Sequence, residues 1–312
     1  MLSEFVVTIV GSLLALFLVV LYFAEPADDA LAAEVILGDR RDDNRWLPPV
    51  FVDFAGAKDV PQNTLAAIQE AKRMNASGIK LYMSITSDDV GVLFHVKTLE
   101  VTANGDGPLD EVAFEDLRRE DITEKNPSAV RYRNERVPTL EEGVDECLRQ
   151  GLRIIVNVEG DDFRAMFALA ELFRKRPELS RRVLVVSPSP MFLFRLGGHN
   201  ATFVTALAWR HGTMAYVDKS YTKRRYENIG WHLIARAADW LLSWSFDYGL
   251  LTRLSMVSAV LVNASMISPQ YAQSWSDWGL RVIALASNDP AEHEYLRRVV
   301  QVPILTDNLR RT

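Results

Sequence analysis

Several residue patterns that carry common chemistries are missing from this sequence of 312 residues. Its one cysteine, Cys147, cannot form a disulfide within the chain, and its helical surroundings predict a small buried side chain. There is no Gly-x-Ser-x-Gly motif, so Ser187 and Ser189 lack the setting of a serine hydrolase nucleophile. A formal net charge of -6 excludes a general nucleic-acid-binding protein, because phosphate binding needs a concentrated basic surface.

Local metal and phosphate motifs are also absent. The Gly-Asp-Gly at residues 105–107 lacks the following helix and lysine of a phosphate-binding loop. Of the five histidines, four fall into no metal-ligand spacing, and these are His199, His211, His232 and His293. His95, at the end of a β-type run, is left as the histidine to consider for catalysis.

A long apolar run opens the chain. Residues 5–23 carry no charge and are about long enough to cross the roughly 30 Å hydrocarbon layer of a bilayer as a helix. No Lys or Arg precedes the run, and it exceeds the roughly 7 to 15 apolar residues of a cleavable signal peptide. We therefore predict an uncleaved transmembrane anchor over residues 1–24, with a cleaved signal peptide as the alternative.

Two sequence features disagree about the side of the membrane on which the rest of the chain lies. Three arginines just beyond the apolar run favour a cytoplasmic side. Three Asn-Ala-Ser or Asn-Ala-Thr sequons favour a luminal or extracellular side, where such asparagines are glycosylated. The arginines are Arg40, Arg41 and Arg45, and the sequon asparagines are Asn75, Asn200 and Asn263.

Beyond the anchor, residues 25–49 are rich in Ala, Asp and Arg and end in two prolines, which predicts a polar linker. From residue 50 onward, β-type runs alternate with helical segments, as βαβ units require. Thr139 and Glu142 form a capping-box pattern, and Asn63 is expected as the N-cap of a helix over residues 64–74. The predicted strands are residues 51–54, 78–83, 90–95, 152–158, 182–186, 202–207, 256–262 and 280–285.

An ordered set of residues across the first three predicted strands carries a family resemblance. The set consists of Gly56, Pro61, Asn63, Thr64, Leu65, Gly78, Ile79, Leu81, His95, Thr98, Leu99, Asn104 and Gly105. The Val-Pro-Thr-Leu-Glu-Glu run at residues 137–142 and the Pro-Ile-Leu-Thr-Asp-Asn run at residues 303–308 belong to the same pattern. Together they resemble the glycerophosphodiester phosphodiesterase family, in particular its animal membrane-anchored type.

The resemblance implies an α/β fold, a (β/α)8 TIM barrel over residues 50–312 with a small insertion after the third strand. It implies hydrolysis of glycerophosphodiesters to glycerol 3-phosphate and an alcohol, by a divalent cation held on three carboxylates and two histidines that move protons. The animal type keeps its barrel on the luminal or extracellular side of the endoplasmic reticulum or plasma membrane. We therefore expect a single-pass membrane protein of that orientation.

The positions at which the resemblance places reactive residues are mostly substituted. Phe-Ala stands where the family has His-Arg, and a glutamine replaces a glutamate in the following turn. Lysine and tyrosine replace a Glu-x-Asp metal pair, and asparagine and glutamate replace the third acidic ligand and a nearby lysine. The family-equivalent site positions are Phe54, Ala55, Gln62, Asn63, Lys80, Tyr82, Asn157 and Glu159, with His95 as a residual catalytic residue.

These substitutions change the expected chemistry. Lys80 and Tyr82 remove two anionic ligands and place a cation beside the site, so we expect no metal cofactor. His95 has no proton-transfer partner, because Phe54 can neither donate nor accept a proton. The predicted function is a membrane-anchored pseudoenzyme of phospholipid metabolism that acts as a binding or interaction module. The alternative is an active phosphoric diester hydrolase with a rewired site that uses Mg2+ or Ca2+.

At two of the substituted positions the charge has the opposite sign to that of the family residue. A lysine, Lys80, takes the place of an acidic ligand, and Glu159 takes the place of a lysine near the same metal. We therefore predict an ion pair between Lys80 and Glu159 in the vacated metal site. The alternative is that the two side chains reach solvent separately.

An aromatic, amphipathic segment over residues 226–251 follows a basic stretch at residues 219–225. Aromatic residues with nearby cations are typical of a helix at a membrane surface. The alternative is a long barrel helix with an apolar inner face, which Asp239 and Asp247 favour. The expected partners are membrane lipids, with a protein partner or a phospholipid headgroup as further candidates, and no nucleic acid.

Overall fold

The computed structural model describes residues 26–38, 46–53, 60–95, 108–120, 132, 135–218, 220–285 and 287–307. The predicted anchor over residues 1–24 and the site positions Phe54 and Ala55 lie outside these ranges. Among the helices of the described ranges, none is long and apolar enough to cross a membrane.

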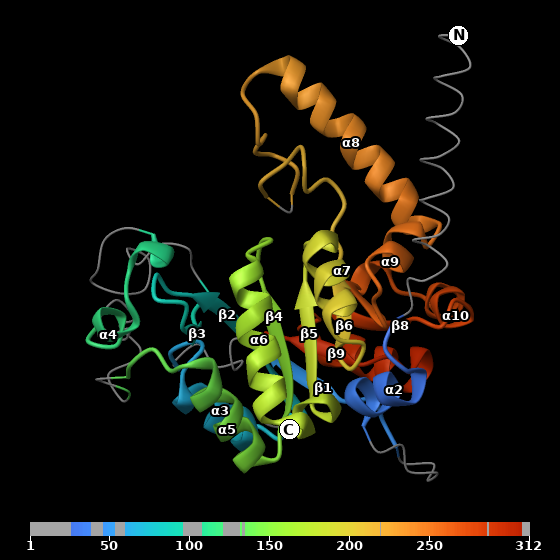
Figure 1. Cartoon of the computed structure of the whole chain (residues 1–312). Helices are drawn as coiled ribbons and strands as arrows, with labels where there is room; N and C mark the ends of the chain where they lie inside the picture. Colours follow the sequence, from blue (N-terminus) through green and yellow to red (C-terminus); the bar gives the residue numbers. More distant parts are fainter. Residues whose placement is uncertain are drawn as a thin grey trace.

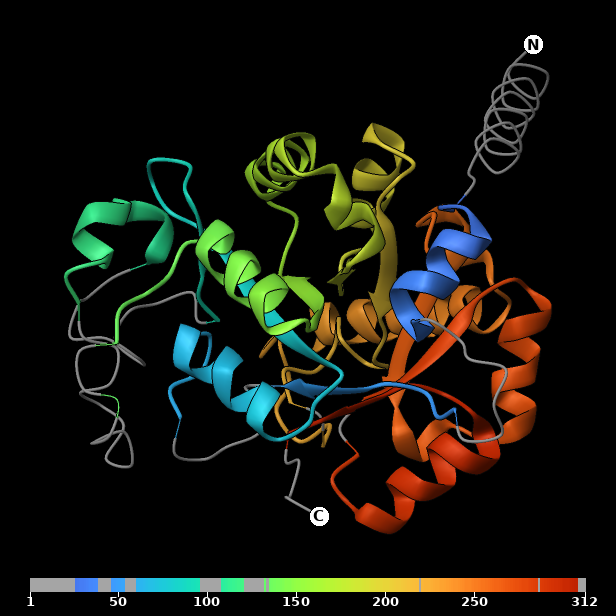
Figure 2. The same cartoon turned by 90° about the horizontal axis from the view of Figure 1, so that it is seen from below.

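Eight parallel strands form a closed barrel, as predicted (Figure 1). The strands are β1 (Val50–Asp53), β2 (Gly78–Ile85), β4 (Arg153–Val158), β5 (Val183–Ser187), β6 (Val204–Ala208), β7 (Ala259–Asn263), β8 (Arg281–Leu285) and β9 (Ile304–Thr306). β1 closes the barrel by pairing with β2 on one side and with β9 on the other. Figure 2 shows β1 and β9 side by side.

The third predicted strand is not part of the barrel. Residues 91–93 form β3 (Gly91–Leu93), which pairs antiparallel with β2, so that Met83 lies opposite Leu93. Only residues 86–90 connect β2 to β3, whereas a parallel connection needs about a dozen residues or more. The run at residues 303–308 supplies the missing strand, β9.

Helices connect the strands on the outside of the barrel, and one of them, α8, projects from the body (Figure 1). They are α3 (Leu65–Arg73), α5 (Leu140–Gln150), α6 (Phe163–Lys175), α7 (Pro190–His199), α8 (Ile229–Asp247), α9 (Leu250–Leu254), α10 (Pro269–Asp277) and α11 (Pro290–Tyr295). Shorter turns are η3 (Leu109–Glu111), α4 (Phe114–Leu117), η5 (Pro177–Arg181), η6 (Ala264–Met266) and the π-helical η7 (Leu296–Val300). β3, η3 and α4 share a small apolar cluster of their own outside the barrel.

Two helix starts test the capping predictions. The capping box of α5 is confirmed, because the Thr139 side chain accepts from the backbone of Glu142 while the Glu142 side chain accepts from the backbone of Thr139. The prediction that Asn63 caps α3 is wrong. Thr64 is the N-cap, and its hydroxyl accepts from the Ala67 amide at 3.1 Å.

A helix that the sequence did not predict covers the amino end of the barrel. α2 (Asp29–Leu37) lies inside the predicted linker and buries Ala32, Val35 and Ile36 against side chains of the barrel interior. Arg153, at the start of β4, donates to the Glu34 carbonyl oxygen at 2.7 Å. Arg281, at the start of β8, forms an ion pair with Asp29 at 2.8 Å. Because both arginines begin strands, α2 sits at the end of the barrel opposite the carboxyl ends.

Strand alternation separates two cores. Ile79, Leu81 and Met83 of β2 point outward and pack against the surrounding helices. Phe51 of β1 and Ile155 of β4 point into the barrel, where they belong to the interior cluster that α2 closes. The side chains at the carboxyl ends of the barrel interior are therefore those at the inward-pointing positions of these strands.

We predict that Ile36→Ala lowers the free energy of unfolding by about 2 to 5 kcal/mol, because Ile36 is fully buried between α2 and the barrel. The measurement is urea unfolding of the full-length chain. Val299→Ala, at an exposed position of η7, is the control and should change that free energy by less than about 0.5 kcal/mol. Equal effects of the two substitutions would show that α2 does not stabilise the barrel.

Candidate functional site

Four polar side chains gather inside the barrel at the carboxyl ends of three neighbouring strands. Asp53 ends β1, Lys80 and Tyr82 lie on β2, and Asn157 lies on β4. The strand register places Asp53 opposite Lys80 and Tyr82 opposite Asn157. All four residues are buried, at the end of an otherwise apolar interior.

Lys80 is the centre of this group. Its Nζ lies 3.1 Å from Asp53 Oδ2 and 2.7 Å from the Tyr82 hydroxyl, and 4.4 Å from the centroid of the Tyr82 ring. The Tyr82 hydroxyl in turn donates to Asp53 Oδ2 at 3.4 Å. The Lys80 and Asp53 side chains are only 7% and 6% exposed, so the ion pair is withdrawn from water. A single internal ammonium thus neutralises the buried carboxylate.

Burial shapes the protonation of the two acidic partners of Lys80. Burial raises the pKa of the Asp53 carboxyl above its ordinary value of 3.8, while the charge of Lys80 acts to lower it. Asp53 Oδ1 is buried and has no hydrogen-bond partner among the described residues, so this carboxylate is only partly compensated. Burial, together with the charges of Asp53 and Glu159, raises the pKa of Tyr82 and keeps its hydroxyl protonated.

The turn before α3 holds the backbone of β2. Asn63 has a positive φ of 55°, which asparagine tolerates well, and its Oδ1 accepts from the Tyr82 amide at 2.9 Å. Asn63 therefore fixes the strand that carries Lys80 and Tyr82. Its neighbour Gln62 is exposed.

His95 and Glu159 lie at the outer edge of the group. The His95 ring packs against the Tyr82 ring with 3.8 Å between centroids, and His95 Nε2 lies 3.7 Å from Glu159 Oε1. The two side chains are 34% and 46% exposed, so water weakens their attraction.

The predicted ion pair between Lys80 and Glu159 is wrong. Lys80 pairs with Asp53, which is its direct neighbour in the strand register, whereas Glu159 follows the end of β4 and faces His95. Asp53 is not among the predicted site positions. The alternation from Phe51 would have placed Asp53 on the inner face beside Lys80.

The donor set around Lys80 does not fit a hard divalent cation. Such a cation needs several oxygen ligands, and the buried members of the group offer one carboxylate, one amide and one phenol. That carboxylate already holds an ammonium, which would repel a second cation. The Glu159 carboxylate at the edge of the group faces His95 instead. Within the described ranges, no three His, Cys, Asp or Glu side chains are placed to hold a metal ion.

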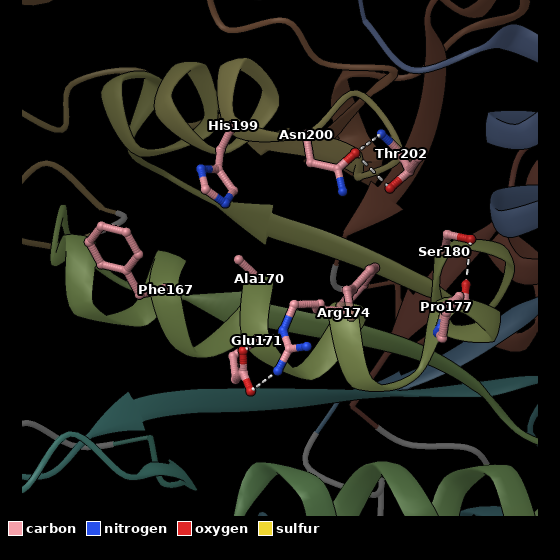
Figure 3. A pocket seen from close by; sticks show the side chains of 10 residues that line it. Phe167, Ala170, Glu171, Arg174, Pro177, Ser180, His199, Asn200 and Thr202 are labelled. Atoms are coloured by element: carbon pink, nitrogen blue, oxygen red, sulfur yellow. Dashed lines mark hydrogen bonds and ion pairs between the residues drawn. The ribbon is translucent and has the colours of Figure 1, made fainter.

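A separate pocket of about 680 Å³ opens on the outside of the barrel between α6 and α7 (Figure 3). Its charged residues neutralise each other, because Arg174 donates to both carboxylate oxygens of Glu171. On the opposite wall, Asn200 Oδ1 accepts from the backbone and side chain of Thr202. None of its lining residues is a candidate site position, so we assign the pocket no function.

The chain is similar to known proteins over most of its length. The sequence pattern of the Glycerophosphoryl diester phosphodiesterase family matches residues 55–311. Glycerophosphodiester phosphodiesterase 1 of Homo sapiens is 33% identical over 259 residues, which cover 81% of this chain and 76% of that protein. The protein of the same name from Bos taurus is 32% identical over 254 residues, with the same two coverages.

Solved structures share the fold. A phosphodiesterase from Oleispira antarctica, solved in complex with the product sn-glycerol-3-phosphate, aligns with a TM-score of 0.63 and 16% identity over 84% of this chain and 93% of its own. A glycerophosphodiester phosphodiesterase from Agrobacterium tumefaciens aligns with a TM-score of 0.63 and 18% identity, over 84% of this chain and 97% of its own. At these identities the likeness shows the fold alone.

We predict that Lys80→Met lowers the free energy of unfolding by about 3 to 5 kcal/mol, because it leaves Asp53 as a buried charge without its partner. The double variant Lys80→Met/Asp53→Asn should recover much of that loss in urea unfolding. Lys80→Met combined with Glu159→Gln is the matched control, and its coupling should stay below about 0.5 kcal/mol. Strong coupling to Glu159 and none to Asp53 would contradict the observed pairing.

The loss caused by Lys80→Met should also depend on pH. Without Lys80, burial raises the pKa of Asp53 with less opposition, so the folded variant favours the protonated carboxyl. A raised folded-state pKa gives stability that is present below the unfolded value, near 3.8, and is lost as pH rises through the folded value. The destabilisation relative to the natural chain should therefore be smallest near pH 4 and grow toward pH 7. In the double variant Lys80→Met/Asp53→Asn, which lacks the titrating carboxyl, the destabilisation should not grow between pH 4 and pH 7. A destabilisation of Lys80→Met that does not depend on pH would contradict the account.

Proposed function

The chain belongs to the glycerophosphoryl diester phosphodiesterase family, and we propose that it is a membrane-anchored member without metal-dependent hydrolase activity. In this proposal the barrel is kept as a binding or interaction module at a lipid surface. The observation that supports the proposal is the buried Lys80–Asp53 pair, because the resemblance makes Lys80 equivalent to one of the family's acidic metal ligands.

The chemistry of phosphodiester cleavage explains why this pair matters. A divalent cation stabilises the charge on the nonbridging phosphoryl oxygens, and it can also activate the attacking water. Lys80 supplies one positive charge, and that charge is already compensated by Asp53 at 3.1 Å. Unlike a metal ion, the ammonium cannot coordinate a water molecule and lower its pKa, so it cannot activate the attacking water.

Proton transfer is the second requirement. A phosphodiester hydrolase needs one group to remove a proton from the nucleophile and another to protonate the leaving alcohol. His95 is partly exposed, packs on Tyr82 and faces Glu159, so it could serve one of these steps. Tyr82 is held as a neutral phenol, and the sequence has Phe54 where the family has its other histidine.

The membrane attachment rests on the sequence. The apolar run at residues 5–23 supports a single-pass anchor with the barrel on the luminal or extracellular side, in the endoplasmic reticulum or the plasma membrane. The three sequon asparagines, Asn75, Asn200 and Asn263, are all exposed, as glycosylation at each would require. Membrane lipids are then the first partners to test, followed by a phospholipid headgroup or a protein partner.

We predict that the full-length chain with Mg2+ or Ca2+ releases no glycerol 3-phosphate from a glycerophosphodiester above the protein-free background. Its titration with either cation should give no saturable heat. The matched variant Lys80→Glu/Tyr82→Asp/Asn157→Asp restores three carboxylates at these positions, and we expect it to gain saturable cation binding.

Circular dichroism of both proteins is the control that the barrel remains folded. Metal-stimulated hydrolysis by the natural chain, abolished by His95→Ala or Asn157→Ala, would instead establish an active phosphoric diester hydrolase with a rewired site.

A further inference from the structure

The face of α8 that points away from the barrel is apolar. Figure 1 shows α8 projecting from the body, joined to β6 by a long loop. Trp240 on this face is 70% exposed, far more than a large aromatic side chain in a water-soluble helix usually is. The exposed large side chains of α8 are Ile229, Trp231, Leu233, Ile234, Trp240, Leu241 and Trp244.

The face of α8 that meets the protein mixes polar and apolar side chains. Asp239 is buried there and accepts from the backbone amides of Met214 and Ala215, both at 2.8 Å. His232 is buried on the same face, and Ser243 hydrogen-bonds His211 at 2.9 Å. Toward the C-terminal end, Phe246 on this same face is fully buried and stacks on Trp209, so the barrel-helix alternative holds for that part of α8. In a surface helix of a soluble protein the apolar stripe faces the core, whereas most of the large apolar side chains of α8 face outward.

The chain enters the described structure beside the C-terminal end of α8. Pro26 lines one cavity together with Tyr248, Gly249, Arg253 and Trp278. The sequence immediately before Pro26 contains the apolar run at residues 5–23. A membrane anchor formed by that run would hold this end of α8 close to the bilayer.

Aromatic side chains gather at the same place. Trp244 and Tyr248 lie with 5.2 Å between ring centroids, and Trp278 is half exposed beside Gly249. Tryptophan and tyrosine prefer the boundary between headgroups and acyl chains, where one end of the ring meets water and the other hydrocarbon.

Basic side chains lie at the other end of the helix. Lys223 and Arg224 are exposed in the turn before α8, and Arg225 is tied to the Thr213 carbonyl oxygen at 3.0 Å. Within α8 the exposed charges are Arg236 and Asp247, which lie on one flank about three turns apart along the helix. Cations at this position would face lipid phosphates if the apolar arc entered the bilayer.

We infer that the outer face of α8 lies in the headgroup–acyl boundary of a lipid bilayer and forms a second membrane contact beside the anchor. With 19 residues, α8 is about 28 Å long and rests along the membrane surface, because its polar face remains packed on residues 211–216. This inference rests on the proposed membrane attachment and adds the orientation of the barrel. A lipid surface is favoured over a second copy or a protein partner because Pro26, which follows the predicted anchor in the sequence, lies beside the C-terminal end of α8.

Spin labels on the full-length chain reconstituted into phosphatidylcholine vesicles test the inference. Leu233→Cys and Leu241→Cys place labels on the outer face of α8, and Phe167→Cys places one on α6 at a position as exposed as Leu233, 56% in each case. The natural Cys147 is buried, and the unsubstituted chain serves as the control for its labelling. We expect the labels at 233 and 241 to become several-fold more accessible to oxygen than to a water-soluble nickel complex, while the label at 167 stays accessible to nickel.

Three outcomes would overturn the inference. If the chain floats with the vesicles but the labels at 233 and 241 stay as accessible to nickel as the label at 167, the anchor stands and α8 does not touch lipid. If those labels broaden one another and the broadening disappears on dilution with unlabelled chain, the face joins two copies. If the full-length chain does not float with vesicles, the proposed membrane attachment fails together with this inference.

Discussion

The balance of charge inside a closed apolar barrel constrains everything at its carboxyl end. Asp53 is buried at the end of β1, and Lys80 reaches it from the neighbouring strand at 3.1 Å. At about 4 Å and an effective dielectric constant near 20, such an attraction is roughly 4 kcal/mol before the cost of desolvation is subtracted. Most of that gain is offset by removing both groups from water. The pair therefore adds little net stability, but removing either charge alone leaves the other buried and unpaired, which is strongly destabilising.

This constraint links the polar residues at the carboxyl ends of β1 and β2 to one another. Tyr82 donates to Asp53 and accepts from Lys80, so its phenol completes the small network that the ion pair begins. Asn63 holds the backbone of Tyr82, which connects the turn before α3 to the same group. The barrel thus keeps the scaffold of its family while the inner ends of β1 and β2 carry an internal cation. The proposal is that this ammonium neutralises charge where a metal ion would otherwise do so, without supplying open coordination sites.

Sequence patterns predicted the parts of the fold that depend on local periodicity. The alternation of strands and helices predicted βαβ units, and the family resemblance implied the barrel. Thr139 with Glu142 predicted the start of α5, because that signal lies within a few residues. The strand at residues 90–95 was wrongly predicted as a parallel barrel strand, because a β pattern does not indicate whether a strand pairs parallel or antiparallel with its neighbour. The short connection at residues 86–90 was the signal that required a hairpin. The pairing of Lys80 was missed because it depends on which strands are neighbours, and α8 was ambiguous because its burial depends on which face the barrel covers.

The central claim is that Lys80 holds the place of a metal, and a crystal structure of the chain soaked in Mn2+ tests it most directly. Anomalous scattering locates bound manganese without reference to the protein atoms. The account predicts no manganese peak beside Asp53, Tyr82 or Asn157, with Lys80 Nζ still bonded to Asp53. A manganese ion bonded to Asp53 and Asn157, with the Lys80 side chain displaced from the barrel, would contradict it.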